Sequence, residues 1–85
     1  MITNVAIRSI QDGKIYSLPK PNRHYNVISM MVSMGLSTPI KGEQGFLTED
    51  GVFLTRSQAA IEAIESGQII KLKWTKRELF SEDLW

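Results

Sequence analysis

The chain has 85 residues, a formal net charge of +1 at pH 7 and no cysteine. This length suits one domain near the lower size limit for folding alone, and the lack of thiols excludes disulfides and cysteine-ligated zinc. The small net charge argues against a nucleic-acid coat protein, and no run of about 18 apolar residues could span a membrane. The segment MITNVAIRSIQDG has no cationic region followed by a long apolar run, so we expect no signal peptide.

Residues 5–18 are predicted to form a first β-hairpin. Two strand-forming runs, 5–10 and 14–18, flank the turn signal Asp12-Gly13. A two-residue turn there would place Ile10 opposite Ile15. Pro19 should end the second strand, because proline has no amide hydrogen to donate to a neighbouring strand.

A first helix is predicted over residues 23–34. Asn22 is the expected N-cap, and Gly35 is the expected stop. Val27 and Met31 fall at helical spacing on one face, which should be the buried face. Residues 36–44, with a proline and a glycine, are predicted to be a loop.

The same order, hairpin then helix, recurs between residues 45 and 68. Strand-forming runs at 46–48 and 52–54 flank Asp50-Gly51, which predicts a type I′ turn with positive φ at both central positions. Thr55 and Gln58 have the spacing of a capping box. The apolar side of the following helix is predicted to comprise Ala59, Ala60, Ile61, Ala63 and Ile64, and Gly67 should end this helix.

The predicted fold class is therefore α+β, with two β-hairpin–helix units (ββαββα) in one domain over residues 1–85 and helices on one sheet face. Residues 69–85 should form a C-terminal strand or an extended arm, because Ile70, Leu72 and Trp74 alternate with polar residues. The ending LFSEDLW should dock on the core or on a neighbouring subunit. We expect a homo-oligomer, because a small chain would have difficulty covering Met30, Met31, Met34, Phe80, Leu84 and Trp85 by itself.

Arg23 and His24 are the first candidate ligand-binding residues. At a helix N-terminus they could hold a phosphate, since backbone amides and the helix dipole favour an anion there. The alternative is structural: His24 packs, and Arg23 pairs with Glu82 or Asp83.

Three further cations complete the candidate ligand-binding site. Arg56 opens the second helix, where a positive charge is unfavourable for the helix dipole. It could instead be a surface residue paired with Glu49 or Glu43. Lys71 and Lys73 belong to a basic alternation around Trp74, and its other members are Lys76 and Arg77. This alternation could follow a phosphate backbone, or it could be a solvated strand face.

Catalytic and metal-binding patterns are missing from the sequence. It has one histidine, no nucleophile elbow, no P-loop and no His-Glu-x-x-His. The acids Glu49, Asp50, Glu82 and Asp83 form adjacent pairs rather than pairs facing each other across a substrate. We therefore expect no enzyme, no metal and no cofactor.

Several motifs together resemble a family of small bacteriophage and prophage proteins. They are Arg23-His24, the block GFLTEDGVFLTRSQAA, the pair Gly67-Gln68 and the ending LFSEDLW, so the resemblance spans residues 23–85. The sequence departs from that family at Ser57-Gln58, where acids are common. The resemblance implies a phage accessory protein in the host cytoplasm, without implying an activity.

A phage accessory protein without catalytic residues is expected to act by binding. The first hypothesis is a counter-defence protein, a sponge that sequesters a nucleotide immune signal with Arg23, His24, Arg56, Lys71 and Lys73. The alternative is a protein–protein inhibitor of a host or defence protein, which predicts an exposed apolar patch. A nucleic-acid-binding module is a further alternative.

Overall fold

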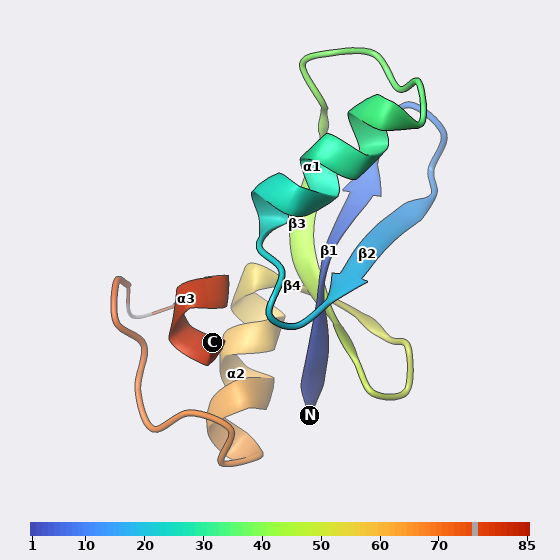
Figure 1. Cartoon of the computed structure of the whole chain (residues 1–85). Helices are drawn as coiled ribbons and strands as arrows, with labels where there is room; N and C mark the ends of the chain where they lie inside the picture. Colours follow the sequence, from blue (N-terminus) through green and yellow to red (C-terminus); the bar gives the residue numbers. More distant parts are fainter. Residues whose placement is uncertain (76) are drawn as a thin grey trace.

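A four-stranded antiparallel sheet in the order β2-β1-β3-β4 organises the chain, as a computed structural model of the protein shows for residues 1–75 and 77–85 (Figure 1). The strands are β1 (Ile2–Ser9), β2 (Ile15–Pro19), β3 (Gly42–Thr48) and β4 (Phe53–Thr55). The helices are α1 (His24–Ser33), α2 (Arg56–Glu65) and α3 (Ser81–Leu84). The α+β class and the ββαββα order are confirmed.

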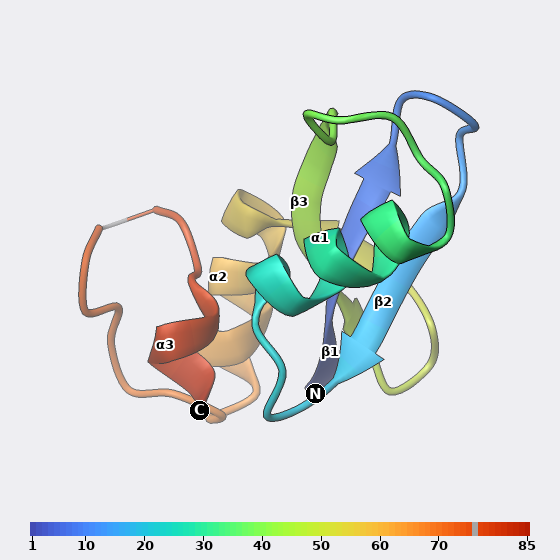
Figure 2. The same ribbon diagram turned by 45° about the horizontal axis from the view of Figure 1, so that its top comes forward.

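Both long helices pack on the same face of the sheet. Val5 on the central strand β1 pairs with Leu18 on β2 and with Phe46 on β3, so these side chains point to one side. Helix α1 adds Val27 and Met31 to this side, and Figure 2 shows the helix lying across the sheet. Helix α2 adds the alanines Ala59, Ala60 and Ala63 to the same core.

The register of the first hairpin differs from the prediction by two residues. Ile15 pairs with Arg8 rather than with Ile10, which lies in the connecting loop and is 75% exposed. Gly13 has a φ of +71°, but no non-glycine residue in the described part of the chain has a positive φ, so Asp12 does not form a type I′ turn. A four-residue loop forms instead, closed by a hydrogen bond of 2.9 Å from the Ser9 amide to the Lys14 carbonyl.

The turn of the second hairpin is also of another type than predicted. Gly51 has a φ of +79°, whereas Asp50 does not have a positive φ. The Gly51 amide donates to the Thr48 carbonyl at 2.9 Å, and the Thr48 amide donates to the Val52 carbonyl at 3.0 Å. These bonds define a three-residue loop with a left-handed glycine at its end. Strand β3 begins at Gly42, inside the segment predicted to be a loop.

Helix α1 begins one residue later than predicted. Its N-cap is Arg23 rather than Asn22, and the Arg23 amide donates to Oδ1 of Asn26 at 2.8 Å. The Asn22 side chain instead donates to the carbonyl of Pro19 at 2.8 Å. Asn22 thus lies in the turn before the helix, and its side chain closes that turn.

The capping box of α2 is confirmed. The Gln58 amide donates to Oγ1 of Thr55 at 3.2 Å, and the Thr55 amide donates to Oε1 of Gln58 at 3.0 Å. Gly67 follows the helix with a φ of +78°, as predicted. The predicted apolar side is only half correct, because the alanines are buried whereas Ile61 is 60% exposed and Ile64 is 45% exposed. Alanines bring the helix close to the sheet, and the isoleucines then point away from it.

The segment after α2 is an arm rather than a strand. We use the name arm for the described residues between α2 and α3, 66–75 and 77–80, none of which is in a strand. Figure 1 shows the arm, in orange, running beside α2 before α3 begins. The expected alternation of burial is absent: Ile70 is 94% exposed and Trp74 is 69% exposed, while Leu79 is fully buried.

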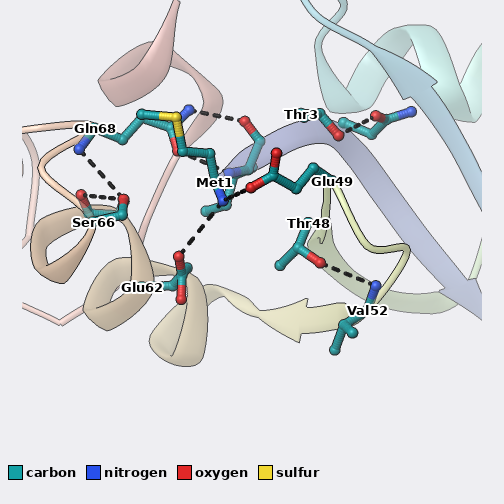
Figure 3. A network of polar contacts seen from close by, with 11 residues as sticks. Met1, Thr3, Thr48, Glu49, Val52, Glu62, Ser66 and Gln68 are labelled. Carbon is teal, nitrogen blue, oxygen red and sulfur yellow. Dashed lines mark hydrogen bonds and ion pairs between the residues drawn. The ribbon is translucent and has the colours of Figure 1, made fainter.

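Gln68 joins the start of the arm to β1. Its Oε1 accepts from the Ile2 amide at 2.8 Å, and its Nε2 donates to the Ile2 carbonyl at 2.8 Å. Figure 3 shows Gln68 beside Met1, whose amino group contacts Glu49 at 3.0 Å and Glu62 at 3.8 Å. The Gln68 side chain thus makes the two hydrogen bonds that a neighbouring strand would otherwise make to Ile2, the first residue of β1.

Most of the apolar surplus that suggested a homo-oligomer is covered within this chain. Met31 is fully buried, Met30, Leu84 and Trp85 are partly buried against the core, and Phe80 is partly buried against the Arg56 guanidinium. Met34 alone among the six is exposed, at 59%. The homo-oligomer stays a prediction, without this surplus as its main support.

Gly45 generates a first testable prediction. A Cβ on this residue would collide with the Leu54 carbonyl oxygen and lie 2.6 Å from Cζ of Phe53. Gly45→Ala should therefore lower the free energy of unfolding by about 3 kcal/mol or more, because backbone cannot move aside as a side chain can. Gly13→Ala is the control: it meets open space and should lose only about 1–2 kcal/mol from its positive φ. Equal losses in urea denaturation of the two variants would contradict the close contact at Gly45.

Candidate functional site

Arg23 points toward the C-terminal end of the chain. Its Nη1 donates to Oγ of Ser81 at 3.2 Å, and Ser81 is buried at the start of α3. The neighbouring Glu82 has a lowered pKa, first because of a hydrogen bond from its own backbone amide, then through Ser81 and the charges of Arg23 and Arg56. The predicted structural pairing of Arg23 with Glu82 or Asp83 is not among the described ion pairs, and Ser81 is its direct partner instead.

His24 is a core residue. Its side chain has an exposed fraction of 8%, and Nε2 lies 2.8 Å from the Gly45 carbonyl oxygen. The ring also meets Phe46 edge-on, with centroids 5.1 Å apart and planes at 84°. Because the carbonyl can only accept, Nε2 must carry a hydrogen. Burial lowers the pKa of His24, so the neutral ring is favoured, and its Nε2–H is already donated to the Gly45 carbonyl.

Arg56 connects the sheet, α2 and the arm. Its Nη1 donates to the Leu79 carbonyl at 2.7 Å, its Nη2 donates to Oε1 of Gln44, and the guanidinium lies 4.4 Å from the centroid of the Phe80 ring. The Leu79 amide in turn donates to the Arg56 carbonyl at 3.0 Å. The sequence suggested Glu49 or Glu43 as a partner of Arg56, but no described ion pair joins Arg56 to either acid. Burial lowers the pKa of Arg56.

The two lysines of the predicted site lie in different surroundings. The backbone amide of Lys73 donates to Oδ1 of Asp83 at 2.7 Å, and its Nζ donates to the Glu82 carbonyl at 2.9 Å. Lys71 is exposed on the far part of the arm. Lys76, which belonged to the same basic alternation, lies outside the described residues. The structure therefore gathers Arg23, His24, Arg56 and Lys73 around α3, with Lys71 apart from them.

Two residues of the predicted docking segment LFSEDLW, neither of them a candidate ligand-binding residue, complete the docking of α3. Asp83 is 8% exposed, and its carboxylate accepts from the amides of Lys73 at 2.7 Å and Phe80 at 2.9 Å. Trp85 donates from Nε1 to the Asn22 carbonyl at 2.9 Å. The available signal was Asp83 three residues after Phe80, the spacing at which a side chain caps a helix start.

A cleft of about 480 Å³ lies beside Arg56. Its lining residues are Gly42, Glu43, Gln44, Thr55, Arg56, Ser57 and Glu78. Two carboxylates against one guanidinium that already has protein partners make this cleft unfavourable for a phosphate. Three of the cations expected to hold a nucleotide, Arg23, Arg56 and Lys73, thus donate to protein groups.

A different, apolar surface lies between α2 and the arm. A pocket of about 280 Å³ is lined by Ser57, Ala60, Ile61, Ile64, Leu72 and Arg77. An adjoining hollow of about 260 Å³ is lined by Ile64, Ile70, Lys71, Leu72 and Thr75. The two share Ile64 and Leu72 and form one surface. We call it the α2–arm surface, defined by Ile61, Ile64, Ile70, Lys71, Leu72 and Arg77.

Comparison with known proteins identifies a family but no closer relative. The family model described as "Phage T4 y16D protein" matches residues 1–85. The comparisons with curated proteins and with solved structures gave no match. Within the described residues no helix has the length and apolar character needed to cross a membrane, and no three potential ligand side chains converge on a metal site.

His24 generates a prediction about pH. Its pKa in the folded protein lies below the ordinary value of 6.5, so the unfolded chain takes up a proton first as the pH falls. The contribution is therefore fully present above pH 6.5 and is lost as the pH falls toward the lowered pKa, by at most about 1.4 kcal/mol per unit. Urea denaturation between about pH 7 and pH 5, above most carboxylate titrations, should show this slope. His24→Gln keeps a donor for Gly45 but should lose the slope; equal slopes would exclude His24 as the cause.

Arg56 generates a prediction about the arm. Arg56→Ala removes two charge-assisted hydrogen bonds and the Phe80 stack, and should lower the free energy of unfolding by about 2–4 kcal/mol. With Trp74 replaced by Phe, the emission of Trp85 should shift to the red as α3 undocks. The matched control is Lys71→Ala, an exposed cation, which should change stability by less than about 0.5 kcal/mol. An unshifted Trp85 emission in Arg56→Ala would show that α3 docks without this guanidinium.

Proposed function

The chain belongs to the phage T4 y16D protein family, and we propose that it is an accessory protein that inhibits a bacterial host or defence protein by binding it in the host cytoplasm. The observation that supports the proposal is the α2–arm surface. Ile61, Ile64 and Ile70 are 60%, 45% and 94% exposed, and all three line the two adjoining hollows of this surface. Exposed apolar surface rimmed by polar residues is typical of a protein-binding site.

The position of these isoleucines strengthens the argument. Helix α2 needs only its alanines to contact the sheet, so folding alone does not require isoleucine on its outer side. Leu72 lies between the two hollows and forms a shared wall. A partner that covered this surface would gain hydrophobic stabilisation on binding, about 1.5–3 kcal/mol for each isoleucine that became fully buried.

Nucleotide sequestration has less support from the geometry. Arg23, Arg56 and Lys73 donate to protein oxygens, and His24 is buried and favoured in its neutral form. A nucleotide would have to compete with these protein acceptors for the cations. Stoichiometric binding of a signalling nucleotide in calorimetry would favour nucleotide sequestration over inhibition of a host or defence protein.

A second copy of the chain is a poor partner for the α2–arm surface. In a two-fold contact, each surface would present Lys71 and Arg77 to the same pair on the other copy, and like charges repel. The predicted homo-oligomer would then use another face. We propose binding rather than catalysis for this surface, because its lining consists of aliphatic, hydroxyl and cationic side chains.

The proposal predicts that a double variant, Ile61→Asp with Ile64→Asp, loses the bacterial partner. Both side chains are exposed, so the fold should persist by circular dichroism while the partner captured from host lysate falls by about tenfold or more. Val52→Asp is the matched control, because Val52 is 53% exposed on the β3–β4 hairpin, away from α2. Capture of the same partner in the same amount by both variants would place the binding site elsewhere.

A further inference from the structure

The charged residues of the α2–arm surface are of one sign. Resting on the proposed function, we infer that this surface binds a short segment of the partner in which Asp or Glu stands next to apolar side chains. Arg77 lines the pocket with Ile61 and Lys71 lines the adjoining hollow with Ile70, and all other lining residues are uncharged. An occupant with the opposite charge is therefore complementary to both hollows.

The two cations are available to a partner. Among the described residues, no ion pair includes Lys71 or Arg77, and both are exposed. The acids of α2, Glu62 and Glu65, are not among the lining residues of the two hollows. Glu62 lies 3.8 Å from the amino group of Met1, and Glu65 lines neither hollow. The positive charge at the rim is thus not neutralised within the lining.

Apolar contact alone would not hold a partner on a surface of this size. Ile61 and Ile64 are already partly buried, so the hydrophobic free energy that three isoleucines could gain is at best comparable to the translational and rotational freedom that association loses. Further contacts are needed, and the rim is where they can form. Opposite charge at a rim also steers the encounter and excludes partners with basic segments.

The apolar hollows distinguish this occupant from other anions. A nucleic acid would place charged phosphates against Ile61, Ile64 and Leu72. The phosphates would then lose water without gaining a polar partner. A second copy would bring the same two cations. A protein segment with alternating or helically spaced apolar and acidic side chains satisfies both parts of the surface.

Selection from a displayed library of random 16-residue peptides tests the inference on the full-length protein. Clones are kept when they bind the wild type and fail to bind Ile61→Asp/Ile64→Asp. These clones should be enriched in Asp and Glu beside Ile, Leu or Phe. A synthetic peptide from the selected set should bind Lys71→Glu/Arg77→Glu about tenfold more weakly than wild type, and replacing its acids by lysine should restore binding to that variant.

The matched control is Lys14→Glu/Lys20→Glu, which changes the net charge by the same amount through exposed residues on the other edge of the sheet. It should bind the acidic peptide within about twofold of wild type. A control that weakens binding as much as Lys71→Glu/Arg77→Glu would reduce the effect to net charge and overturn the inference.

The outcomes separate this inference from the proposed function. Three results would overturn the inference of an acidic segment. The selected peptides could be poor in acids, the selection could yield no clone specific for the surface, or a DNA or RNA oligonucleotide could compete with the peptides. The proposed function would still stand if host-protein capture depended on Ile61 and Ile64. Loss of that dependence would overturn the function itself.

Discussion

The guanidinium of Arg56 joins three parts of the chain, helix α2, strand β3 and the arm. It donates to Gln44 on β3 and to the Leu79 carbonyl in the arm, and it stacks on Phe80 just before α3. A planar group with several fixed donors can make these contacts at once, which a lysine ammonium cannot. The buried position of Leu79 and the path of the arm both follow from this arrangement.

The path of the arm creates the surface to which we assign binding. Because the arm returns along α2, Leu72 faces the outer side of that helix and forms a wall beside Ile64. The alanines of α2 permit close packing on the sheet, so its isoleucines are left at the boundary with solvent. The proposed binding surface is therefore a consequence of how the C-terminal residues dock.

The motifs that carried the family resemblance have structural roles. His24 donates to Gly45, Arg23 to Ser81, Gln68 completes the hydrogen bonding of Ile2, and Asp83 caps the start of α3. Arg23-His24 meets the ending at Ser81 and the central block at Gly45, whereas Gln68 fixes the start of the arm to Ile2, outside the motifs. This explains why residues of the kind that often bind ligands serve here to hold the protein together.

The sequence by itself determined the order of hairpins and helices, the capping box of Thr55 and Gln58, and the stop at Gly67. These features depend on residues three or four positions apart, or on the conformational freedom of one glycine, so local chemistry is sufficient to specify them. Only the tertiary structure decided the hairpin register, the outward direction of Ile61 and Ile64, and the partners of the cations. Arg56 meets Leu79 across 23 residues and Arg23 meets Ser81 across 58. No periodicity within one segment contains that information, because it depends on how close α2 lies to the sheet and where the arm returns.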